Sequence, residues 1–135
     1  IWPEMPARFE RMEASIALAK QDPPDLTKAD AADWVEEQLP LPQQSGVTRV
    51  LMHSIVWQYL PQATKDRITV AMETAGKTAT VDKPLAWISL ETNRKTFSHE
   101  LVIRYWPGGE APALLGRAHA HGAWVEWFDL QKRTG

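Results

Sequence analysis

The chain has 135 residues, a length typical of one domain. Hydrophobic residues make up 44% of the chain and charged residues 24%, which excludes wholesale disorder. With 15 Lys and Arg against 17 Asp and Glu, the formal net charge is −2, which argues against a surface that follows nucleic-acid phosphates. The absence of cysteine excludes disulfides, thiolate nucleophiles and cysteine-ligated metals.

The hydropathy of the chain and its first residue indicate the expected location and domain organisation of the protein. No run of 18 apolar residues is present and no signal-peptide pattern is visible, so we expect no membrane association and a cytoplasmic location. The chain begins at Ile1 rather than at a methionine. We therefore expect residues 1–135 to form a single α/β domain that is the C-terminal fragment of a longer protein.

The first third of the chain predicts two helices. Apolar residues at spacings of three and four predict a helix over residues 4–21 with one apolar stripe. These residues are Met5, Phe9, Met12, Ile16 and Ala19. Residues 25–27 are compatible with a short strand. Asp30 is a good N-cap for a second helix over residues 31–39.

Residues 47–90 predict a strand, a helix and a second strand. Residues 47–52 predict a buried strand, because Val50, Leu51 and Met52 form an unbroken apolar run, which is typical of a parallel strand covered on both faces. A short helical turn is expected over residues 55–60. The next helix begins at Pro61, and Gly76 suits its C-terminal cap. A second buried strand over residues 85–90 completes a βαβ unit.

The remainder of the chain predicts antiparallel strands. Residues 99–106 and 113–121 are strand-like and are separated by a Pro- and Gly-rich turn at residues 107–112. A further short strand is expected over residues 124–128. The predicted fold is thus an α/β domain with a mixed, mainly parallel sheet, flanking helices and a C-terminal antiparallel hairpin.

One candidate site lies at the end of the first buried strand. In open α/β sheets, ligands bind outside the carboxyl ends of the strands, which is where His53 and Ser54 fall. We therefore take them as candidate catalytic residues, with Trp57 and Tyr59 as candidate ligand-binding residues in the following turn. The structural alternative is that Ser54 caps this turn and His53 bonds a backbone carbonyl.

A second candidate site is the pair His119 and His121. At strand spacing both imidazoles project to one face, and they would bind zinc or iron if His99 or Glu126 supplied a third ligand. Arg117 on the same face would oppose a cation, and solvent-facing polar residues are the plainer interpretation. We therefore predict no tight metal site. The sequence also lacks the glycine-rich nucleotide motifs, the nucleophile elbow and the zincin motif.

Four separated segments resemble, in order, a bacterial family known as domain of unknown function 2332. They are VLMHSIVWQYLP at 50–61, PLAWISLE at 84–91, WPGGE at 106–110 and AHGAWVEW at 120–127. The resemblance covers nearly the whole chain. It implies an uncharacterised bacterial protein without an established activity, whose members carry a substantial N-terminal part that this chain lacks.

The predicted order of elements is similar to the later part of a class I S-adenosylmethionine-dependent methyltransferase. In that comparison residues 25–30, 47–52 and 85–90 are the third, fourth and fifth strands. The comparison implies that Asp30 lies near an adenine pocket and His53 and Ser54 near the reacting methyl group. The glycine-rich turn and the ribose-binding acid would lie upstream of Ile1. S-adenosylmethionine is thus the cofactor that the comparison implies for a full-length protein, and we expect no cofactor to bind this fragment.

The same comparison predicts self-association. Without the upstream strands, the strand at residues 47–52 would have one unpaired apolar edge, which is a template for pairing with another chain. We therefore expect a two-fold homodimer, unless residues 25–27 or the first helix cover the gap. Two alternatives to a methyltransferase-like enzyme stay open, a non-catalytic binding or assembly domain and a small histidine metal site.

Overall fold

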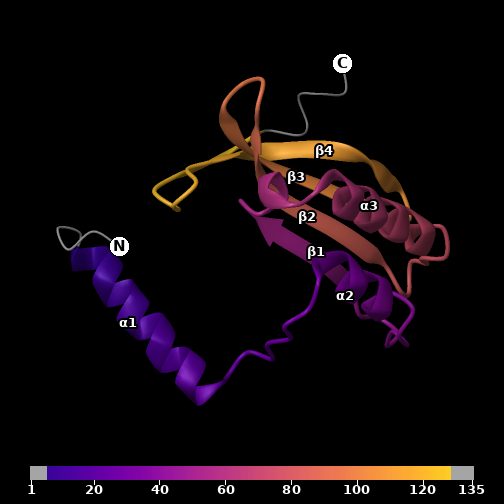
Figure 1. Ribbon diagram of the computed structural model, residues 1–135, viewed down its shortest axis with the longest axis horizontal. Coiled ribbons are helices and arrows are strands. Elements are labelled where there is room, and N and C mark those ends of the chain that lie inside the picture. The colour runs from indigo at the N-terminus through magenta and orange to yellow at the C-terminus, as the bar shows by residue number, and fades with distance from the viewer. Residues whose placement is uncertain (1–5, 129–135) are drawn as a thin grey trace.

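The computed structural model describes residues 6–128 and places one sheet beside a layer of helices (Figure 1). In chain order the elements are α1 (Pro6–Gln21), α2 (Ala31–Gln38), β1 (Arg49–Ser54), the 3₁₀ turn η1 (Trp57–Tyr59), α3 (Gln62–Gly76), β2 (Leu85–Asn93), β3 (Ser98–Trp106), β4 (Gly109–Ala118) and β5 (Val125–Trp127). The predicted helices and the βαβ unit are thus present, although positions 4 and 5 of the first helix lie outside the described residues.

The five strands form one sheet in the order β1-β2-β3-β4-β5. β1 and β2 are parallel, whereas β2–β3, β3–β4 and β4–β5 are antiparallel. The expectation of a mainly parallel sheet is therefore wrong. The reason is the connections: only β1 and β2 are joined through a helix, and the short links between the later strands allow antiparallel neighbours alone.

The β2–β3 hairpin was not predicted from the sequence. Its turn contains neither Gly nor Pro. Instead, the Asn93 side chain accepts a hydrogen bond from the Lys95 amide at 2.9 Å, and the Phe97 amide donates to the Asn93 carbonyl at 2.7 Å. Phe97 itself adopts a φ of +57°. Asn in such a turn supplies its own local hydrogen bonds, so the usual turn residues are not needed.

The β3–β4 connection is shorter than predicted. Residues 107–112 were expected to join the strands, but β4 already begins at Gly109. The link is Pro107–Gly108, with a cis peptide bond before Pro107 and a φ of +96° at Gly108. β4 ends at Ala118 rather than at residue 121.

α2 and α3 cover a single face of the sheet. The core consists of side chains from α2, α3 and the helix-facing side of the sheet: Ala32, Val35, Ile68, Met72, Leu85 and Trp106. On the opposite face, Val50 and Met52 of β1 are 48% and 64% exposed. The prediction that residues 47–52 are covered on both faces is therefore wrong for the described residues.

α1 lies apart from this two-layer body (Figure 1), and none of its described residues is buried. The connecting residues 25–27, predicted as a possible strand, are exposed and form no strand. They do not pair with the outer edge of β1, which has no neighbour in this sheet.

The ends of α2 and α3 are set by different means. As predicted, Asp30 caps α2, since its carboxylate accepts the amides of Ala32 and Asp33. Gly76 was expected at the C-terminal cap of α3 but is its last helical residue. A Cβ at this position would lie 2.6 Å from the Trp106 indole, so close helix–sheet packing requires the glycine.

Candidate functional site

The two candidate catalytic residues at the end of β1 point to opposite faces of the sheet. Exposure alternates along β1, so His53 faces the helices whereas Ser54 lies exposed on the other face. The structure therefore does not bring the two side chains together. His53 lies at the carboxyl end of the parallel β1–β2 pair, as the sequence analysis expected.

His53 is held by side chains of β2 on both of its ring nitrogens. Its Nδ1 lies 2.8 Å from Glu91 Oε1, and the Trp87 indole Nε1 donates to His53 Nε2 at 2.9 Å. The imidazole also stacks on Trp57, with ring centroids 4.9 Å apart and planes 15° apart. The side chain of His53 is 12% exposed and that of Glu91 is 16% exposed. The ring therefore has one fixed orientation.

These hydrogen bonds determine the tautomer of His53. An indole N–H only donates, so Nε2 of His53 must be the acceptor and carries no proton. The remaining nitrogen, Nδ1, then carries the proton and donates it to Glu91. A second proton on Nε2 would require the Trp87 hydrogen bond to break.

Glu91 also holds the segment that follows β1. Its Oε1 accepts the amides of Val56 at 3.0 Å and Trp57 at 3.1 Å, in addition to His53. Directly before them, Ile55 has a φ of +52°, which is rare for a β-branched residue. The other carboxylate oxygen, Oε2, is buried and has no hydrogen-bond partner within residues 6–128. Strained backbone of this kind is concentrated at functional sites.

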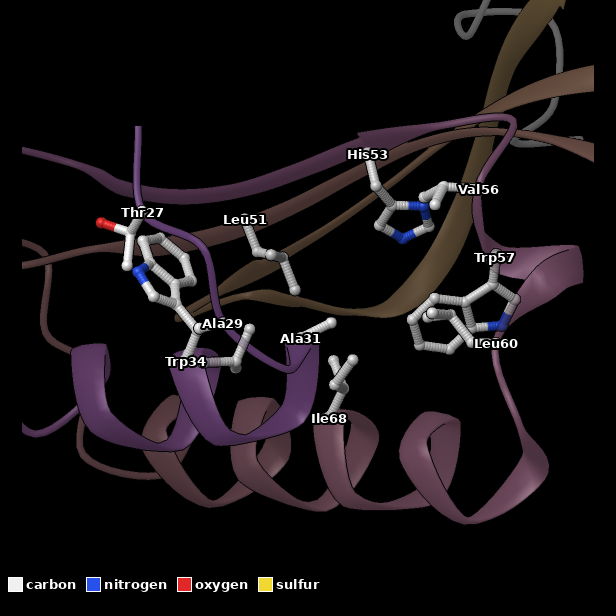
Figure 2. A pocket seen from close by; sticks show the side chains of 11 residues that line it. Thr27, Ala29, Ala31, Trp34, Leu51, His53, Val56, Trp57, Leu60 and Ile68 are labelled. Atoms are coloured by element: carbon white, nitrogen blue, oxygen red, sulfur yellow. The ribbon is translucent and has the colours of Figure 1, made fainter. Parts of the chain in front are cut away.

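A pocket of about 240 Å³ lies between α2, β1 and η1. Figure 2 shows Trp34 of α2 and Trp57 of η1 on two sides of it, with Leu51 and His53 reaching in from β1 and Ile68 from α3. The further lining residues are Thr27, Ala29, Ala31, Val35, Val56 and Leu60. The pocket is thus mainly apolar, and His53 is its one titratable lining residue.

The other predicted ligand-binding residues take different positions. Trp57 lines the pocket together with His53. Tyr59 is 75% exposed and does not line it. Asp30 does not line it either, because its carboxylate caps α2. Of the three residues, only Trp57 joins His53.

A second pocket of about 310 Å³ also adjoins the stacked rings of His53 and Trp57. Charged and polar side chains line it as well, namely Ser89, Glu91 and Arg104, together with Trp87. Arg104 is well anchored there: its guanidinium lies 3.0 Å from Glu73 Oε1 and 4.9 Å from the Trp106 ring centroid.

His119 and His121 do not assemble a metal site with the proposed third ligands. Their rings pack edge to face at 5.6 Å, and His119 Nδ1 accepts the His121 amide at 3.1 Å. His99 instead contacts Thr92 through Nδ1 at 3.0 Å. Within the described residues no group of three or more His, Asp or Glu side chains is placed to hold a metal ion.

Glu91, Trp87 and Trp34 were not among the site residues predicted from the sequence. The signal for Glu91 was present: it is an acid at the carboxyl end of the strand that runs parallel to β1, where polar side chains of the two strands meet. The two tryptophans carried no such signal, because seven tryptophans in the chain favoured a core role for each of them.

Comparison with known proteins gives a family but no activity. The model of a family described as uncharacterized protein conserved in bacteria (DUF2332) matches residues 1–127. No curated protein and no solved structure matches the chain. Residues 6–128 contain no helix that is both long and apolar enough to cross a membrane. The chain belongs to the DUF2332 family of uncharacterised bacterial proteins.

Proposed function

We propose that this domain binds a small, uncharged planar group in the pocket between α2 and β1. One observation carries the proposal: His53 lies at the carboxyl end of the parallel pair, at an apolar pocket flanked by Trp34 and Trp57. Apolar and aromatic linings with a few fixed polar groups are typical of ligand sites. Thr27 adds a side-chain hydroxyl to this lining.

The size and charge of the pocket narrow the ligand class. Its volume of about 240 Å³ is below the range of roughly 300–1,000 Å³ for drug-sized ligands, so it suits a single ring system. No Asp, Glu, Lys or Arg lines it. A charged ligand would lose hydration without gaining a partner, whereas a neutral aromatic ring would stack on the tryptophans.

The geometry supports binding better than proton transfer by His53. A general base needs a free nitrogen within hydrogen-bond reach of the substrate. Nε2 of His53 already accepts the Trp87 indole, and Nδ1 is engaged with Glu91. His53 in this arrangement fixes the shape of the pocket and orients Trp57 through their stacking.

Calorimetry with indole and adenosine as probes tests this proposal. We expect dissociation constants on the order of 1 mM, appropriate for a small ring without charged contacts. Ala29→Phe adds a ring beside the pocket and is expected to weaken binding at least tenfold. Ala63→Phe places the same ring on an exposed position of α3 outside the pocket and is the matched control. Equal weakening by both variants, or no binding of either probe at roughly 10 mM, contradicts the proposal.

A methyltransferase-like role is the second candidate function. The parallel β1–β2 pair with His53 at its carboxyl end favours it. The residues present do not fit S-adenosylmethionine as a whole, because the Asp30 carboxylate is used as the cap of α2 and no acid lines the pocket. We therefore expect residues 1–135 to bind S-adenosylmethionine more weakly than micromolar. Micromolar affinity by calorimetry would overturn this expectation.

A further inference from the structure

Two apolar surfaces lie unpartnered within residues 6–128. The first is the stripe of α1, where Phe9, Met12 and Ile16 are 52%, 42% and 49% exposed. The second is the side of the sheet away from α2 and α3, here called the open face. Its most exposed large side chains are Val50, Met52, Tyr105, Val125 and Trp127, which are 46–67% exposed.

Strand register shows that the open face is continuous across the sheet. Val50 lies beside Ala86, which lies beside Tyr105, and Met52 lies beside Ile88, which lies beside Ile103. Paired residues share a face, so these rows carry apolar side chains from β1 to β3. A contiguous apolar patch of this extent is typical of an interaction surface.

The dimensions of α1 match this surface. Its 16 residues extend about 24 Å, and five strands are about 19 Å across from the first to the last. The stripe and the open face are both uncharged, so neither would bury an unpaired charge on contact. One α1 helix therefore has the length to cross the whole open face.

We propose that a second copy of this chain covers the open face, with each copy laying its α1 across the sheet of the other. α1 projects away from its own sheet (Figure 1), and Arg8 near its beginning donates to the His121 carbonyl. Residues 22–30 lead from α1 to α2, which lies on the helix-covered face. Exchange of a projecting arm between identical chains gives a closed two-fold dimer.

The available area is sufficient for such a dimer. The eight exposed side chains of the stripe and the open face carry on the order of 800 Å² per copy, which equals the share of one partner in a standard interface. In a two-fold exchange both surfaces of both copies are covered at once. This arrangement removes all of the large exposed residues named above from water.

Light scattering coupled to gel filtration tests the proposal. At roughly 100 μM we expect a mass near twice the 15.3 kDa of the chain. Phe9→Asp combined with Ile16→Asp, or Met52→Asp on the open face alone, should each halve this mass. Leu18→Asp is the control, because Leu18 is 66% exposed on α1 but lies off the stripe, and it should leave the mass unchanged.

Three results would overturn the proposal. A monomeric mass for the unaltered chain shows that α1 covers its own sheet or stays free. A dimer that survives the α1 substitutions assigns the contact to another surface, such as the outer edge of β1. If Leu18→Asp disrupts the dimer as strongly as the other substitutions, the added charge and not the lost apolar contact is the cause. Circular dichroism of each variant establishes that its sheet is folded.

Discussion

His53 illustrates how neighbouring side chains decide what one residue can do. Alone, an imidazole at the end of a parallel strand suggests acid–base chemistry. Here Trp87 donates to one nitrogen and Glu91 accepts from the other, so the ring is a structural part of the pocket. The same carboxylate holds the amides of Val56 and Trp57, which links the ring to the strained turn after β1.

The first prediction at the scale of single residues concerns the tautomer of His53. Long-range ¹H–¹⁵N spectra at neutral pH should show a proton on Nδ1 and an unprotonated Nε2, because the Trp87 indole donates to Nε2. In Trp87→Phe this donor is absent, and the Nε2 resonance should move toward that of a free acceptor nitrogen. A protonated Nε2 in the unaltered protein would contradict the network.

Gly76 gives the second prediction. Gly76→Ala should lower the free energy of unfolding by about 1–3 kcal/mol, because the added Cβ overlaps the Trp106 indole at 2.6 Å. Urea titration measures the change. The loss should shrink in a Trp106→Leu background, where the indole is absent. An equal loss in both backgrounds would show that Trp106 is not the cause.

At the scale of elements, the turn of the hairpin between β2 and β3 contains a residue with a strained backbone conformation. Phe97 has a φ of +57° while its side chain is 82% exposed, so the backbone strain is offset by little burial. Phe97→Gly should therefore raise the free energy of unfolding by about 0.5–1 kcal/mol. Phe97→Ala keeps the strain and should bring no gain. If Phe97→Gly and Phe97→Ala change the free energy of unfolding equally, the loss of the phenyl ring and not the backbone strain is the cause.

The pairing of α2 with α3 gives a prediction on pH. The hydrogen bond from Arg67 lowers the pKa of Glu36 below its ordinary value of 4.5. The ionised form is therefore favoured by folding, and its contribution is present above pH 4.5 and is lost as the pH falls through the lowered pKa. In Arg67→Gln the pKa of Glu36, followed by NMR of its carboxyl carbon, should rise.

Glu110 is the internal control for this titration. The pKa of Glu110 is also lowered, but by the Gly108 amide, which does not involve Arg67. It should stay lowered in Arg67→Gln. A Glu36 pKa that is the same in both proteins would show that the ion pair does not form in solution.

Local sequence patterns predicted the helices and strands better than they predicted which surfaces pack against each other. The spacing of Phe9, Met12 and Ile16 predicted α1 correctly, and Asp30 correctly marked the start of α2. Within residues 6–128 nothing covers this stripe, because apolar periodicity does not reveal which surface lies opposite. Likewise, the run around Val50 was correctly a strand but has one covered face only.

The site was predicted in part for a related reason. The rule that ligands bind at the carboxyl ends of parallel strands located His53 and Trp57. It did not separate Ser54 from His53, although adjacent residues of a strand face opposite sides. Which of the two residues faces the helices depends on the packing of β1 in the folded sheet. Glu91 lies 38 positions from His53, and only the β1–β2 pairing brings the two together.

At the scale of the whole molecule, the domain is a half-covered sheet with different features on its two faces. The helix-covered face carries the core, the pocket and His53, whereas the open face is apolar and exposed. The proposed ligand site and the proposed dimer contact therefore lie on opposite sides of the same strands. Each can be altered without touching the other, since His53 and Met52 are neighbours in sequence but face apart.

The most direct test of the pocket as a ligand site is an indole N–H spectrum of the ¹⁵N-labelled protein during titration with adenosine. We expect the Trp34 and Trp57 signals to shift together and saturate, because both rings line the pocket. The signal of Trp124, which is 51% exposed and outside the pocket, should stay unchanged. Uniform small shifts of all tryptophans, or shifts that exclude Trp34 and Trp57, would contradict it.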